Sequence, residues 1–321
     1  MKKRIVTFFI LINCFFIQAQ TYNEYVQKGD SCYKAQDYKL SVFYFEKAFK
    51  IEHKISDDLY NGACAAALSN DHKKAFEWLN LTIDNGYENI AYLQKDQDFE
   101  SLRAKKEWRK LISKFQKKLN ILEANYDKPL QKELLAIYAE DQDIREILMK
   151  IYKEKGIGNK SFDSINKLMG YKDSVNLKKV VKILDEKGWV GKNVVGSQAN
   201  KTLFLVIQHS DLKYQQKYLP MMRDAVKKGN ASANSLALLE DRVALRERHK
   251  QIYGSQISMI PGAKAFVLPL EDPDNVDKRR AEVGLGPIAD YVKKWNIVWD
   301  VEAYKKELPE LERISQERKT K

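Results

Sequence analysis

The sequence predicts an all-α chain in which a short array of paired helices is followed by a separate, mostly helical domain. Three observations lead to this prediction. Apolar residues recur at helical spacing through most of the chain, and one unit of 34 residues occurs twice near the N-terminus. In the second half, only residues 265–268 have the pattern of an extended segment. The 321 residues, 44% hydrophobic and 31% charged, suffice for two hydrophobic cores.

Residues 1–19 are expected to be an export signal. Three basic residues at 2–4 precede an apolar stretch from Ile5 to Ile17, and Ala19 supplies a small residue for cleavage. At 1.5 Å per residue this stretch spans about 20 Å, less than the roughly 30 Å of a bilayer's hydrocarbon core. An uncleaved anchor and a lipid on Cys14 are the alternatives. We expect an exported protein of the periplasm or cell surface, with no transmembrane segment after cleavage.

The charge and the cysteines are interpreted in the light of export. The net charge of +12 becomes +9 when the three basic residues at 2–4 are removed. The remaining basic residues are scattered among acidic ones, so we expect a solubilising surface and no nucleic-acid partner. An oxidising compartment would allow Cys32 and Cys64 to pair, but cysteine is also a common buried helix residue. Both thiol states stay open.

Residues 20–118 contain the repeated unit and a capping segment. Positions 34 apart share their character in four pairs: Tyr25 with Leu59, Gly29 with Ala63, Ser41 with Ala75, and Phe45 with Leu79. Small residues at fixed positions allow two antiparallel helices to approach, and large ones fill the space between them. Residues 22–88 resemble tetratricopeptide repeats (TPR), although Lys28 and Ser41 depart from the usual pattern. Residues 89–118 follow as a helical cap.

The resemblance implies a binding surface on the repeats. In this family the inner face of the first helices usually holds an extended peptide or a partner helix. Carried over by position, the groove candidates are Tyr33, Lys34 and Tyr60. The carboxylate clamp that some members carry is absent, since Val26 and Asp30 occupy two of its positions. We expect a protein or peptide partner here; the alternative is a platform that docks on the second domain.

A linker at 119–129 is expected to lead into a helical domain at 130–299, and a charged tail at 300–321 ends the chain. The pattern predicts helices over 130–152, over 176–187, from Ser197 as N-cap residue, over 211–228 with Pro220 inside, and over 232–250.

The second domain also carries a recognisable set of motifs. They are Gly188-Trp189-x-Gly191, Gln208-His209-x-Asp211, Glu240-Asp241-Arg242-Val243 and Gln251-x-Tyr253-Gly254-x-Gln256. Asp141-Gln142-x-x-Arg145 upstream and Arg279-Arg280 downstream fit the same pattern. Together they are similar to a widespread bacterial domain of unknown function, over residues 130 to 295. This resemblance implies an architecture and no particular reaction.

The chemistry of this domain is therefore judged on its polar residues. The catalytic candidates are His209, Asp211, Asp241 and Arg242, and the ligand-pocket candidates are Gln208, His209, Asp241, Arg242, Gln251, Tyr253 and Gln256. In one interpretation they form a pocket in which the imidazole carries a proton and the guanidinium holds an anion. In the other, which we favour, they form an internal network that fixes how the helices cross.

Known catalytic and cofactor motifs are not matched. Gly191-x4-Gly196-Ser197 has phosphate-loop spacing but lacks the lysine and the hydroxyl residue after it, so nucleotide hydrolysis is not expected. The segment could still offer N–H groups and Lys192 to an anion. No spacing predicts a metal site, and no cofactor is expected. The sequence thus favours an exported interaction or ligand-binding protein. The alternative is a hydrolase or transferase acting on an anionic substrate.

Overall fold

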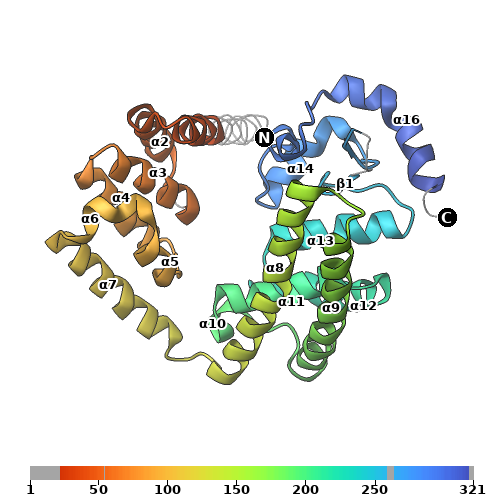
Figure 1. The fold of residues 1–321 in the computed structure, drawn as a ribbon, viewed down its shortest axis with the longest axis horizontal. Coiled ribbons are helices and arrows are strands. Elements are labelled where there is room, and N and C mark those ends of the chain that lie inside the picture. Colours follow the sequence, from red (N-terminus) through yellow and green to blue (C-terminus); the bar gives the residue numbers. More distant parts are fainter. Residues whose placement is uncertain (1–21, 54, 259–263, 318–321) are drawn as a thin grey trace, which may run out of the picture. The chain divides into compact units, whose positions relative to one another are not determined.

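The computed structural model describes residues 22–53, 55–258 and 264–317 (Figure 1). The expected export signal lies outside these residues. The chain divides into two compact units, Met1–Ala124 and Asn125–Lys321. The predicted all-α class is confirmed, because the described residues are mainly helical and their strands form one two-stranded sheet. Within the described ranges, no helix combines the length and the apolar character needed to cross a membrane.

The first unit consists of helices joined by short turns. Residues 22–34 form the first described helix. The others are α2 (Tyr38–Ile51), α3 (Ser56–Leu68), α4 (His72–Asp84), α5 (Ile90–Lys95), the 3₁₀ turn η1 (Gln97–Phe99), α6 (Glu100–Arg103) and α7 (Lys106–Glu123).

Two consecutive helix pairs in this unit share the same local geometry. The turn of the first pair places Gln36 at φ 61°, and 34 residues later Asn70 has φ 66°. Asp37 then accepts a hydrogen bond from the N–H of Leu40 and caps α2. Asp71 caps α4 in the same way through the N–H of Lys74. The 34-residue offset of the sequence is therefore also an offset of the backbone, and the packing is compatible with a repeat array.

Small residues set the distance between the paired helices. A Cβ on Gly29 would lie 3.0 Å from the ring of Phe45, and one on Gly62 would lie 2.7 Å from the ring of Phe49. Ser41 is fully buried, and its hydroxyl donates to the carbonyl of Gly29 at 2.8 Å. A serine is accommodated here because its hydroxyl bonds across to the facing helix.

The remaining elements of the first unit close its core. Phe99, Leu102, Trp108 and Leu111 are buried in the same cluster as the helix pairs, at the positions expected of a cap. Cys32 and Cys64 are both free thiols.

The second unit begins with two long helices. Its helices are α8 (Lys128–Lys155), α9 (Lys160–Lys187), α10 (Lys192–Val195), α11 (Ser197–His209), α12 (Leu212–Lys227) and α13 (Ala233–Arg246), then α14 (Val276–Glu282), α15 (Ile288–Val292) and α16 (Val301–Glu317). The strands β1 (Ile257–Ser258) and β2 (Phe266–Val267) and the 3₁₀ turns η2 (Pro273–Asn275) and η3 (Lys293–Trp295) complete it. The connection from α7 to α8 is shorter than the expected linker.

A helical bundle forms the main core of this unit. In Figure 1, α8 and α9 run antiparallel, and α11 packs against both. The hydroxyl of Thr202 donates to the carbonyl of Leu134 at 3.1 Å, which links α11 to α8 inside the core. Helix α11 begins at Ser197, as expected, but its N-cap residue is Gly196 and no side chain caps it. Pro220 lies inside α12, as the pattern predicts.

The C-terminal part has a smaller core of its own. Strands β1 and β2 pair antiparallel, with Ile257 opposite Val267. The expected tail at 300–321 includes α16, whose Tyr304 and Leu311 are buried in this third cluster. The Tyr304 hydroxyl accepts from the N–H of Leu270 and donates to the carbonyl of Leu268, both at 2.9 Å. Helix α16 therefore belongs to the folded unit, because it supplies part of the core.

Candidate functional site

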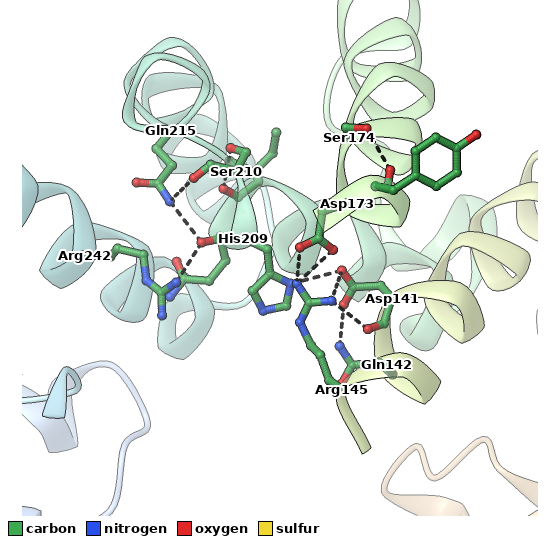
Figure 2. A network of polar contacts seen from close by, with 12 residues as sticks. Asp141, Gln142, Arg145, Asp173, Ser174, His209, Ser210, Gln215 and Arg242 are labelled. Atoms are coloured by element: carbon green, nitrogen blue, oxygen red, sulfur yellow. Dashed lines mark hydrogen bonds and ion pairs between the residues drawn. The ribbon is translucent and has the colours of Figure 1, made fainter. Parts of the chain in front are cut away.

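The last residue of α11, His209, joins three helices through a polar network (Figure 2). Its Nδ1 lies 3.0 Å from Oδ1 of Asp141 on α8. Arg145 lies 3.2 Å from the same carboxylate oxygen, and its Nη2 donates to both oxygens of Asp173 on α9 at 2.9 Å. The side chain of Gln142 donates to the other oxygen of Asp141 at 2.6 Å.

The carboxyl group of Asp141 is charged at neutral pH. Burial works against its charge, but the hydrogen bond with His209 and the charges of His209 and Arg145 outweigh burial, so its pKa lies below the usual range. A charged carboxylate accepts hydrogen bonds, so Nδ1 of His209 carries the hydrogen. In a neutral ring Nε2 is then the acceptor nitrogen.

A cavity of about 250 Å³ lies beside this network. His209 and Asp211, both expected site residues, line it together with Asp141 and Asp173. Asp173 is not among the residues expected here, because nothing in the sequence near α9 marks it. With three carboxylates in its wall, this cavity does not favour an anionic substrate. The geometry thus gives little support to a hydrolase or transferase for anions at His209.

Arg242 is engaged by backbone and not by a carboxylate. Its Nη1 donates to the carbonyl of Gln208 at 3.0 Å, and its Nε donates to the side chain of Gln256 at 3.2 Å. Arg246 donates to the carbonyl of Ser210 at 2.8 Å. Burial, with the nearby charge of Arg246, lowers the pKa of Arg242 to about 10, so the group stays protonated at neutral pH. Both cations thus stabilise the negative end of α11.

Asp241 holds a loop in place. It is fully buried and accepts hydrogen bonds from the N–H groups of Ile252, Tyr253 and Ser255, at 2.7, 2.9 and 2.9 Å. Gln251, also fully buried, donates to the carbonyls of Gln256 and Leu268 and accepts from the N–H of Gln256. Both side chains are fully engaged with the chain itself.

The same loop is tied down from its other side. Arg280, 2% exposed, donates to the carbonyl of Tyr253 at 2.7 Å and lies 4.9 Å from the ring centroid of Tyr291. The Tyr291 hydroxyl donates to the carbonyl of Ser255 at 2.7 Å. The sequence pattern includes Arg280 but gives it no role. These contacts favour the network interpretation for Asp241, Gln251, Tyr253 and Gln256.

A second candidate site lies in the first unit. A cavity of about 690 Å³ is lined by all three expected groove residues, Tyr33, Lys34 and Tyr60. Its other wall comes from the segment between α5 and η1, which includes Asp96 and Asp98. The hydroxyl of Tyr33 donates to Asp98, and that of Tyr60 donates to Asp96 at 2.6 Å. The sequence predicts this segment as a cap only, so its contribution to the groove is new.

The groove is acidic. Asp30, Asp96 and Asp98 line it, and none of these carboxylates lies within 4.0 Å of a Lys or Arg nitrogen in the described chain. Lys34, an exposed residue, is the one cation among the described lining residues. Burial raises the pKa of Asp30, which reflects the cost of holding a charge there without an ion pair.

Three groups in the groove also lie close enough to hold a metal ion. One ligand atom each from Cys64, Asp96 and Asp98 falls within 4.8 Å of the others. Burial and the two carboxylates raise the pKa of the Cys64 thiol far above its usual range, so the thiol is protonated and a poor ligand. The carboxylates already accept the tyrosine hydroxyls. The trio is best described as a hydrogen-bonded cluster.

Residues 128–304 match a family of unknown function, DUF6624. The match covers 177 of 321 residues, which is more than half of the chain. The chain belongs to the DUF6624 family. No curated protein and no solved structure gives a significant match. The expected resemblance to a domain of unknown function is thereby confirmed.

The two candidate sites differ in their relation to the family. The DUF6624 match contains the Asp141–His209 network and the loop held by Asp241. The acidic groove, lined by residues between 30 and 98, lies outside the matched residues.

Proposed function

We propose that this chain is an exported interaction protein. Its first unit, two tetratricopeptide-type repeats with a cap, binds an extended protein segment that carries a Lys or Arg side chain. The observation that carries this proposal is the acidic groove, where Tyr33 and Tyr60 lie beside carboxylates without ion pairs. Export rests on the basic and apolar pattern of residues 2–19.

The repeat assignment is supported by the shared offset. The turn residues Gln36 and Asn70 and the capping residues Asp37 and Asp71 each recur after 34 residues, the length of a tetratricopeptide unit. Glycine and serine at the helix contacts fit the small positions of such repeats.

The charge of the groove defines the partner. Three carboxylates and one ammonium group leave two negative charges in its wall. An incoming Lys or Arg side chain would supply the missing positive charge, and the faces of Tyr33, Tyr60 and Tyr92 favour a cation. An extended segment fits a groove whose two walls come from paired helices and a cap.

Asp30 and Lys34 provide the sharpest test. The side chain of Asp30 has a single hydrogen bond, a long one of 3.5 Å from Asn61, so Asp30→Asn should leave the fold intact. We expect D30N to weaken binding of Lys- or Arg-containing peptides from a synthetic library by about three- to fivefold. Lys34→Gln should strengthen it by a similar factor, because it removes the competing cation. Fluorescence anisotropy at low and high salt measures both effects.

Glu24→Gln is the matched control. Glu24 lies on the same helix as Asp30, is exposed, and does not line the groove. Equal losses in D30N and E24Q, or equal binding of acidic and basic peptides, would refute a groove selective for cations. Export has its own test: N-terminal sequencing of the protein recovered outside the cytoplasm should begin at Gln20.

A further inference from the structure

A separate cavity of about 620 Å³ lies in the second unit, at the opposite end of α11 from His209. It is bounded by the loop before α11 and by the loop that joins α12 to α13. Its volume falls in the range of small-molecule sites. The residues that matter below are Trp189, Lys192, Lys201, Phe204, Met222 and Leu238, all of which line it.

The wall of this cavity is basic. Lys192 and Lys201 line it, and no Asp or Glu is among the described lining residues. Across the described chain, neither lysine lies within ion-pair distance of a carboxylate. The charge here is thus opposite in sign to that of the groove in the first unit.

Two helices of full length begin at the same cavity. The first turn of α11 and the first turn of α13 both contribute to its lining, and neither helix has a side-chain cap. Uncapped first-turn N–H groups and the positive end of the helix dipole both attract anions. Two such ends and two lysines therefore create a positive potential in one place.

An unpaired buried donor lies in the same wall. Trp189 is 7% exposed, and its indole N–H is buried without a hydrogen-bond partner among the described residues. Such a donor costs free energy when it is left unsatisfied, so buried donors usually have an acceptor. A bound molecule with an oxygen acceptor would supply one.

The two loops around the cavity are fixed to each other. The side chain of Asn200 donates to the carbonyl of Val190 at 2.6 Å and to that of Asn230 at 2.8 Å. A Cβ on Gly191 would lie 2.4 Å from Oδ1 of Asn230, so only glycine allows this approach. The cavity is thus formed in advance of any ligand.

We infer that this cavity binds a small organic anion, with a carboxylate or phosphate monoester group and an apolar body. The lysines and helix ends would hold the anionic group, and Phe204, Met222 and Leu238 would contact the apolar part. This site is independent of the groove proposed above, and the two can be tested separately.

Binding can be followed at Trp189 itself. The full chain labelled with ¹⁵N is titrated with phenyl phosphate, benzoate, inorganic phosphate and neutral benzyl alcohol, and the indole N–H signal of Trp189 is assigned with Trp189→Phe. We expect phenyl phosphate or benzoate to shift this signal with saturation, and whichever binds tighter identifies the anionic group. Lys201→Gln and Lys192→Gln should each weaken binding by about fivefold. Lys178→Gln, an exposed lysine on α9 outside the cavity, should not.

Three results would overturn this assignment. Benzyl alcohol could bind as tightly as the anions, K178Q could weaken binding as much as K201Q, or no anion could shift the Trp189 signal more than the other indole signals.

Discussion

The strongest stability prediction concerns Asp241→Ala. Asp241 is fully buried and accepts three backbone N–H groups of one loop. The N–H of Ser255 is fully buried and the other two are partly buried. An unsatisfied buried donor costs about 1–3 kcal/mol, so the three together cost about 4 kcal/mol. Burial raises the pKa of Asp241, and losing that buried charge offsets part of the cost. We expect a net loss of about 3 kcal/mol.

Urea unfolding followed by circular dichroism measures this loss. With a slope of about 2 kcal/mol per molar urea, the transition of the second unit should move down by about 1.5 M. The neighbouring Glu240→Ala is the control, since it removes only a partly exposed ion pair with Arg223 and should cost less than about 1 kcal/mol. If D241A and E240A shift the transition equally, Asp241 does not anchor the loop. Should D241A fail to fold, D241N keeps one acceptor oxygen and should show an intermediate shift.

Three further predictions follow from single contacts. Gly62→Ala should destabilise the first unit by about 1–3 kcal/mol, because its Cβ would meet Phe49; Gly170→Ala in α9 meets nothing within 4 Å and should raise the melting temperature, and the opposite order would contradict this packing. The pKa of Asp141 is lowered, so its stabilisation is complete above about pH 4 and is lost as the pH falls through the folded pKa. The stability gap between wild type and Asp141→Asn should therefore shrink in acid, and a gap that is constant with pH would be evidence against it. Cys64, buried with a raised pKa, should react with a thiol reagent only on unfolding, whereas rapid labelling of the native chain would show an open groove.

The repeat could be predicted from sequence because its signals are local. The offset between Gln36 and Asn70 and the capping residues Asp37 and Asp71 all lie within one 34-residue unit. The first half of α9 gave no such signal. No side chain between residues 160 and 175 is buried, so no apolar stripe marks this stretch as helical.

The partners within the site depend on tertiary register and were beyond reach. His209 and Asp141 belong to motifs that the sequence shows, but their contact depends on how α11 lies along α8. Asp173 and the wall of the groove at Asp96 and Asp98 have no local signal, since exposed acidic residues are common in helical proteins.

The register between α8 and α11 has a consequence for insertions and deletions. Thr202 bonds to Leu134, and His209 to Asp141, and each pair is separated by 68 residues. Residues 156–159, which join α8 to α9, lie between both partners, so a change of length there can leave both contacts in place. One residue added between positions 134 and 141 would instead turn Asp141 by about 100° around the helix axis. Relatives that keep the histidine–aspartate contact should therefore differ in length at the tip of this hairpin, and not along its arms.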